Sequence, residues 1–337
     1  MNYYSVHNIV NIKTNLDLPI PSYFKVDSLQ DVDLEFVMKD IKVNVSENRK
    51  KRSGAFFYWI NSKALNIQYE LPLINARMII DNLEGKTKIE FTKAFIKYGK
   101  IWSLFEVVFA IKLLQKKHTI IHSGCLKYKD DGLLFVALRD TGKTSTVLSL
   151  LDGKNFRFLS DDQVIVNEKG VALCYPRKVN ISPYTLTSDV LKPSNDLKNR
   201  IKRRLARSRF EVIFGDVLKI NMGDMREVPR ELIEKDAEIR KVFVLSGGYE
   251  SDGIKDIDNE EVVRRILVNT FEIYNLLSVY SLNFYYQLFD FDIFGLIDRQ
   301  RKIVKKALED VECYEVRANS VEKYPKLVKK LLNGDYD

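Results

Sequence analysis

Residues 137–144 constrain the fold of this chain more than any other segment. They read Ala-Leu-Arg-Asp-Thr-Gly-Lys-Thr, and we call them the Gly-Lys-Thr loop. The loop matches the phosphate-binding pattern G-x-x-x-x-G-K-[ST] except at the first glycine, where Ala137 stands. An apolar run at 133–138 has the length of a strand, and residues 143–151 have helical spacing. This order of strand, loop and helix directs backbone N–H groups toward an anion.

The loop pattern gives particular side chains a chemical role. Lys143 is expected to reach the outer phosphates of a nucleoside triphosphate, and the hydroxyl of Thr144 to be a ligand of Mg²⁺. The other residues expected at the nucleotide are Arg139, Asp140, Thr141, Gly142 and Ser145. We therefore expect ATP and Mg²⁺ as cofactors. The alternative is a chance Gly-Lys-Thr at an ordinary helix start, which the preceding apolar strand disfavours.

Two adjacent carboxylates, Asp161 and Asp162, follow an apolar run at 156–159. Phosphoryl transfer needs a metal anchor and a group that orients or deprotonates the acceptor. We expect both to be catalytic, one of them taking the proton of an attacking hydroxyl and the other lying near the metal. Thr144 and Asp162 are the residues expected at the metal. A solvent-facing acidic turn is the alternative.

His122 and Arg177 are further candidates for the same site. His122 lies in a strand predicted at 120–128, which we expect to pair with the strand that leads into the loop. A structural histidine is the alternative there. Arg177 could supply positive charge to the transition state, with Arg240 and Lys241 as rivals that the sequence does not rank.

Hairpins on both sides of the loop predict an α/β (α+β) fold with a mixed sheet. One turn lies at 129–132, and another at 168–170 joins strands at 163–167 and 171–175. The other elements expected after the loop are strands at 239–246 and 313–316 and helices at 259–288, 293–310 and 320–332. The helix at 259–288 carries many aromatic residues, which favours a packed core or an interface of a homo-oligomer.

The length of 337 residues suggests two domains, which we place at 1–100 and 101–337. The first is rich in predicted strands, at 34–45, 55–60, 65–71 and 87–91, with a mobile surface loop at 45–54. A helix is expected at 102–117. The role of residues 1–100 is not indicated.

Composition favours a cytoplasmic protein. The three cysteines, Cys125, Cys174 and Cys313, are far apart and suggest neither a disulfide framework nor a zinc site. The first residues lack a basic segment followed by an apolar core, and no stretch is long and apolar enough for a transmembrane segment.

The net charge of +8 favours anionic partners, and much of it falls at 198–209. Leu197, Ile201 and Leu205 recur there every fourth residue, which predicts a helix with a basic outer face. That face could meet an acidic protein, RNA or an anionic lipid surface, although a solvated helix is favoured.

Four segments together resemble the HPr kinase/phosphorylase-like proteins, a superfamily that includes the phosphoenolpyruvate carboxykinases. They lie at 120–124, 137–144, 159–162 and 174–177, and the resemblance extends over about 101–332. It implies a mixed-sheet carboxykinase-type P-loop fold, with Lys143 and Thr144 serving nucleotide and metal. It also implies that Asp161 and Asp162 are the catalytic aspartate pair and that His122 is an active-site histidine.

We therefore predict an ATP-dependent kinase that transfers the γ-phosphate to a hydroxyl of an unidentified protein or small molecule. Ala137 and Asp140 depart from the usual loop and motivate a second hypothesis, a nucleotide-binding regulatory or assembly module without catalysis. An RNA-binding protein or RNA-directed kinase is the third, and it rests on the basic segment at 198–209.

Overall fold

The computed structural model describes residues 1–42, 50–69, 74, 76–98, 101–181, 185, 187–188 and 224–335. The chain divides into two compact units. Unit 1 comprises Met1–Thr119 and Phe271–Lys302, and unit 2 comprises Ile120–Thr270 and Ile303–Asp337. This division differs from the predicted boundary near residue 100, because segments 101–119 and 271–302 group with the N-terminal part. The basic segment at 198–209 lies outside the described residues.

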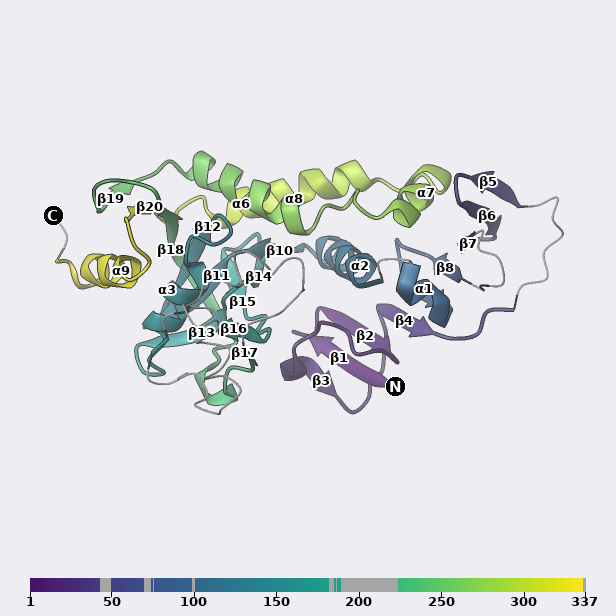
Figure 1. Cartoon of the computed structure of the whole chain (residues 1–337), viewed down its shortest axis with the longest axis horizontal. Helices are drawn as coiled ribbons and strands as arrows, with labels where there is room; N and C mark the ends of the chain where they lie inside the picture. Colours follow the sequence, from purple (N-terminus) through teal and green to yellow (C-terminus); the bar gives the residue numbers. More distant parts are fainter. Residues whose placement is uncertain are drawn as a thin grey trace, which may run out of the picture. The chain divides into compact units, whose positions relative to one another are not determined.

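Unit 1 is built on a nine-stranded sheet in the order β3-β1-β2-β4-β9-β8-β7-β6-β5 (Figure 1). The strands are β1 (Asn2–Val6), β2 (Val10–Thr14), β3 (Lys25–Val26), β4 (Leu34–Met38), β5 (Lys51–Ser53), β6 (Phe56–Asn61), β7 (Ala64–Tyr69), β8 (Arg77–Asp81) and β9 (Thr87–Phe91). Strand β4 runs parallel to β2 and β9, and the other neighbours are antiparallel. The predicted surface loop is wrong for residues 51–53, which form β5, and residues 45–49 lie outside the described part.

The helices of unit 1 differ from the sequence prediction at residues 259–288. They are η1 (Ser22–Phe24), α1 (Lys93–Tyr98), α2 (Ile101–Gln115), α7 (Tyr280–Leu288) and most of α8 (Ile293–Ala307). The single helix predicted at 259–288 is wrong, because α6 (Asn259–Ile273) ends before α7 begins. Between them, Oδ1 of Asn275 accepts the N–H of Leu277 at 2.9 Å, a local turn that competes with the helix.

Unit 2 has a mixed sheet, as predicted, in the order β10-β14-β15-β18-β12-β11-β13, with β20 beside β18 and β19 beside β20. Its strands are β10 (His118–His122), β11 (Gly124–Tyr128), β12 (Asp131–Ala137), β13 (Phe156–Ser160), β14 (Gln163–Asn167), β15 (Val171–Leu173), β18 (Asp236–Ser246), β19 (Gly253–Asp256) and β20 (Glu312–Arg317). A separate pair joins β16 (Val179–Ile181) to β17 (Asp224–Arg226). Strands β12, β18 and β20 are parallel, whereas β11 is antiparallel to β12.

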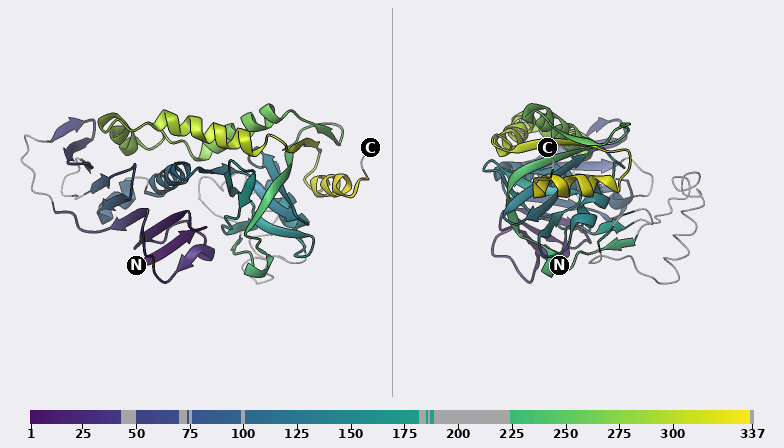
Figure 2. Two further views of the ribbon diagram at one scale, coloured as in Figure 1. Left: turned by 180° about the vertical axis from the view of Figure 1, so that it is seen from behind. Right: turned by 90° about the vertical axis from the view of Figure 1, so that its left-hand side faces the viewer.

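Helices α3 (Lys143–Leu150) and α9 (Lys323–Asn333) pack together beside this sheet (Figure 2). Unit 2 also contains most of α6 and the short η4 (Arg230–Leu232). Val147, Leu148 and Leu151 are fully buried in the core of this unit, as their helical spacing predicts. Within the described residues, no helix is long and apolar enough to cross a bilayer.

Candidate functional site

The Gly-Lys-Thr loop connects the end of β12 to the first turn of α3, as the sequence predicts. Ala137 is still part of β12, opposite Leu245 of β18, so the backbone there is extended and does not need a glycine. Gly142 does need to be a glycine. Its φ is +105°, and a Cβ atom on it would lie 2.7 Å from Cγ1 of Val321. Asp140 also has a left-handed backbone, with φ of 62°.

Lys143 and Thr144, in the first turn of α3, both contact the predicted aspartate pair. The Nζ of Lys143 donates to the backbone oxygen of Asp161 at 2.9 Å and to Oδ1 of Asp162 at 3.3 Å. The hydroxyl of Thr144 donates to Oδ2 of Asp161 at 3.2 Å. The geometry therefore pairs Thr144 with Asp161, whereas the sequence paired it with Asp162.

A local turn at the end of β13 holds the two aspartates at this position. The Oγ of Ser160 accepts the N–H groups of Asp162 and Gln163, at 3.2 and 2.9 Å. Such side-chain bonds to the backbone end a strand and start a turn. As a result both carboxylates reach α3, although consecutive residues of a regular strand would point to opposite faces.

His122 joins the same cluster by a route that the sequence did not predict. Its Nδ1 lies 3.2 Å from Oδ1 of Asp162, close enough for an ion pair when the imidazole is protonated. The predicted pairing of the strand at 120–128 with the loop strand is confirmed for residues 124–128 and wrong for the part that carries His122. The chain breaks at Ser123, so β10 lies beside β14, and only the following strand β11 pairs with β12. Asp162 immediately precedes β14, which brings it to His122.

The two carboxyl groups have different electrostatic environments. Burial raises the pKa of Asp161 to about 6; the charge of Lys143 opposes this shift and the charge of Asp162 adds to it. Burial also acts against ionisation of Asp162, but His122 and Lys143 outweigh it and hold the pKa of Asp162 below its usual range. Two titratable neighbours whose pKa values are driven apart are typical of a functional site.

The remaining candidates differ in their exposure to solvent. Arg139 and Asp140 are exposed, Thr141 is half-buried and Ser145 is buried. Arg177 is half-buried after β15, and Tyr175 just before it donates its N–H to the carbonyl of Leu159 in β13.

Arg240 and Lys241 do not reach the site. In the parallel pair of β12 and β18, Lys241 lies opposite Leu133, whereas the loop follows the far end of β12. Their side chains pair with Glu238 and Glu312.

A cavity of about 370 Å³ adjoins the Gly-Lys-Thr loop, and the sequence did not predict it. It lies at the carboxyl ends of the parallel strands β12 and β18, where α/β sheets commonly bind ligands. Its apolar wall comprises Val136, Ala137, Leu138, Val244, Leu245 and Val268. Its polar lining comprises Thr141, Ser246, Gly247, Tyr249, Arg264, Arg265, Asn269 and Glu315. Gly247 and Gly248 after the predicted strand marked its carboxyl end, but nothing in the sequence marked Asn269 or Glu315.

The hydroxyl of Thr144 and the carboxylate of Asp161 are suitable oxygen ligands for Mg²⁺. No group of three or more His, Cys, Asp or Glu side chains in the described part of the chain is arranged to hold a metal. Mg²⁺ is commonly bound through one or two carboxylates together with substrate phosphates and water. The two residues therefore fit a Mg²⁺ ion that is completed by a nucleotide.

Comparisons with known proteins do not assign a family to the chain. No family model and no curated protein matches the chain. Among solved structures, it is similar to the HPr(Ser) kinase/phosphatase from Coxiella burnetii, with 10% sequence identity and coverage of 64% of this chain and 95% of that chain. The TM-score is 0.29, so this similarity identifies neither the fold nor the function.

Proposed function

We propose that the chain is a Mg²⁺-dependent kinase that transfers the γ-phosphate of ATP to a hydroxyl of an unidentified acceptor. The observation that carries the proposal is the contact of Lys143 and Thr144, at the start of α3, with the adjacent carboxylates of Asp161 and Asp162. Binding alone does not call for a carboxylate pair, whereas transfer needs both a metal anchor and a group for the acceptor.

The loop and the start of α3 bind the triphosphate. Backbone N–H groups at the helix N-terminus face the phosphates, and Lys143 exchanges part of its contact with Asp162 for phosphate oxygens. Thr144 and Asp161 would hold Mg²⁺, which supplies neutralisation of the charge on the phosphates when bound. Because Asp161 is buried, an acceptor in solvent does not reach its carboxylate, which we therefore assign to the metal.

Asp162 serves the acceptor. Its side chain is 43% exposed, so an acceptor hydroxyl can approach it, and its lowered pKa keeps it ionised at neutral pH. The hydroxyl oxygen forms a bond to the γ-phosphorus while the bond from that phosphorus to the bridging oxygen of ADP breaks, and Asp162 takes the hydroxyl proton. His122, 3.2 Å from the same carboxylate oxygen, orients Asp162.

The test is incubation of the protein with γ-labelled ATP, Mg²⁺ and fractions of a cell extract, each treated afterwards with protease or nuclease. We expect label in one fraction, and we expect Lys143→Ala and Asp162→Asn to remove it. Matched controls are Lys154→Ala and Asp236→Asn, which change exposed residues of unit 2 and should retain transfer.

Transfer by Asp162→Asn at the unaltered rate would contradict the assignment. ATP binding with neither label transfer nor ADP release in any fraction would favour the regulatory module instead.

A further inference from the structure

The Gly-Lys-Thr loop contacts two places in succession. Its first residues line the cavity, and its last residues contact the aspartate cluster. Leu138 and Thr141 line the cavity, whereas Lys143 and Thr144 contact the aspartates. A ligand whose phosphates lie on this loop can therefore extend toward the aspartates at one end and into the cavity at the other.

Helix α6 connects the two sides through consecutive residues. Asn269 lines the cavity, and its Nδ2 donates to the carbonyl oxygen of Ala137 at 3.1 Å. Thr270 follows, and its hydroxyl oxygen accepts the N–H of His122 at 3.1 Å. Both α6 residues are buried, so the cavity wall and the cluster are fixed by the same helix.

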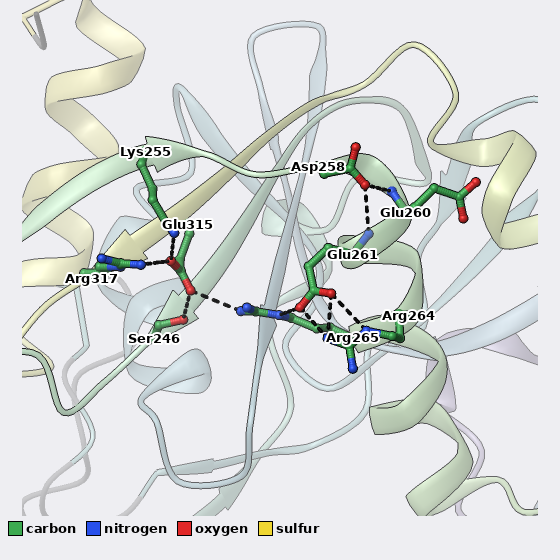
Figure 3. Close-up of polar contacts among 9 residues, drawn as sticks. All are labelled: Ser246, Lys255, Asp258, Glu260, Glu261, Arg264, Arg265, Glu315 and Arg317. Atoms are coloured by element: carbon green, nitrogen blue, oxygen red, sulfur yellow. Dashed lines mark hydrogen bonds and ion pairs between the residues drawn. The ribbon is translucent and has the colours of Figure 1, made fainter.

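The far wall of the cavity is a charged network centred on Glu315 (Figure 3). Its carboxylate accepts bonds from Ser246, Lys255, Arg265 and Arg317, at 3.0, 3.0, 3.2 and 2.8 Å. The Glu315 side chain is only 2% exposed. Burial acts against its ionisation, but Lys255 and Arg317 outweigh burial and lower the pKa of Glu315 to about 2.

Arg265 lines the cavity and also contacts two carboxylates. Its Nε donates to Glu261 and its Nη1 to Glu315, which uses two of the five N–H groups of a guanidinium. The carboxylate of Glu315 already accepts from four side chains, so the charged group that this wall offers to a ligand is the guanidinium of Arg265. The cavity thus combines an apolar wall with the guanidinium of Arg265.

We infer that the cavity holds the nucleoside of the triphosphate, with its ring faces against the apolar wall and an acceptor-bearing edge toward Arg265. This inference rests on the proposed function and specifies which end of the substrate occupies which side of the loop. The acceptor hydroxyl is excluded from the cavity because it must reach Asp162, which the loop separates from it. A volume of about 370 Å³ lies within the range of small-ligand sites, about 300–1,000 Å³.

The test compares ATP with inorganic tripolyphosphate, both with Mg²⁺, by titration calorimetry. Val268→Trp fills the cavity from its rim, and Val268 is 60% exposed, so the larger side chain needs no rearrangement of the core. We expect the wild type to bind ATP at least tenfold more tightly than tripolyphosphate. Val268→Trp should lose that advantage and keep its affinity for tripolyphosphate, which also shows that it is folded. Lys329→Trp, at an exposed position of α9, is the matched control.

The other outcomes separate the inference from the proposed function. Unchanged ATP affinity in Val268→Trp, or equal wild-type affinities for ATP and tripolyphosphate, would overturn the nucleoside assignment and leave the kinase proposal standing. Absence of binding of both ligands to the wild type would overturn both.

Discussion

The ammonium group of Lys143 lies 3.3 Å from Oδ1 of Asp162, with 9% of the lysine side chain exposed and 43% of the aspartate. The lysine that we propose to bind phosphate is therefore paired with a carboxylate in the empty site. Because an unpaired buried charge is costly, this pairing stabilises the empty site. A triphosphate would then compete with Asp162 for Lys143. Once Lys143 binds the phosphates, the carboxylate of Asp162 is available to an acceptor.

Gly142→Ala should destabilise the protein through the loop backbone. The substitution combines a φ of +105° with a Cβ atom placed 2.7 Å from Val321, and strain of this kind costs roughly 1–3 kcal/mol. Gly248→Ala is the matched control, because Gly248 also has a positive φ, +82°, but nothing lies within 4 Å of the added Cβ. Urea denaturation should show a larger loss for Gly142→Ala. Equal losses would show that the contact with Val321 is unimportant.

Glu315→Gln should lower stability in a pH-dependent way. The pKa of this carboxyl falls from 4.5 to about 2 on folding, so ionised Glu315 contributes stability above pH 4.5 that is lost as the pH falls toward 2. That shift corresponds to about 3 kcal/mol at neutral pH. The difference between Glu315→Gln and the wild type should therefore shrink in urea denaturation at pH 3.

Glu312→Gln is the control for this effect. Glu312 lies on the same strand, but its side chain is 58% exposed and pairs with Lys241, and exposed pairs contribute about 0–1 kcal/mol. A loss in Glu315→Gln no larger than in Glu312→Gln would mean that the network on Glu315 is not stabilising.

Asp162→Asn should separate chemistry from binding. Loss of the group that takes the acceptor proton should lower kcat by roughly 10²–10⁴. The Kd for ATP should not rise, because Asp162 no longer competes with the phosphates for Lys143. His122→Asn should lower kcat less, because His122 acts through Asp162. Asp236→Asn should behave as wild type. Steady-state ADP release together with calorimetry measures both quantities, and a raised Kd with unchanged kcat in Asp162→Asn would place Asp162 at the nucleotide instead.

The elements that could be predicted from the sequence are those whose structure depends on residues close together in the chain. The strand, loop and helix around Gly142 are present, and so is the hairpin turned at Gly170, because local spacing and turn residues determine them. The partner of the His122 strand could not be predicted, since it depends on the break at Ser123. The cavity was also out of reach of sequence analysis, because Asn269 and Glu315 join it only through tertiary packing.

The short strands of unit 1 were missed for a related reason. Strand β3 has two residues and β5 has three, too few for any alternation of apolar and polar residues to be recognised. In β5 the paired residues Lys51 and Arg52 read as a solvated loop, and only their register with β6 makes them a strand.

The most direct test of the central claim is calorimetric titration of the wild type, Lys143→Ala and Lys154→Ala with ATP and Mg²⁺. We expect the wild type and Lys154→Ala to bind alike. Lys143→Ala should bind about 30-fold more weakly or not at all, since truncating one partner of a buried charge contact costs 2–5 kcal/mol. Equal binding by all three proteins, or no heat with any of them, would contradict the claim that the Gly-Lys-Thr loop holds a triphosphate against Asp161 and Asp162.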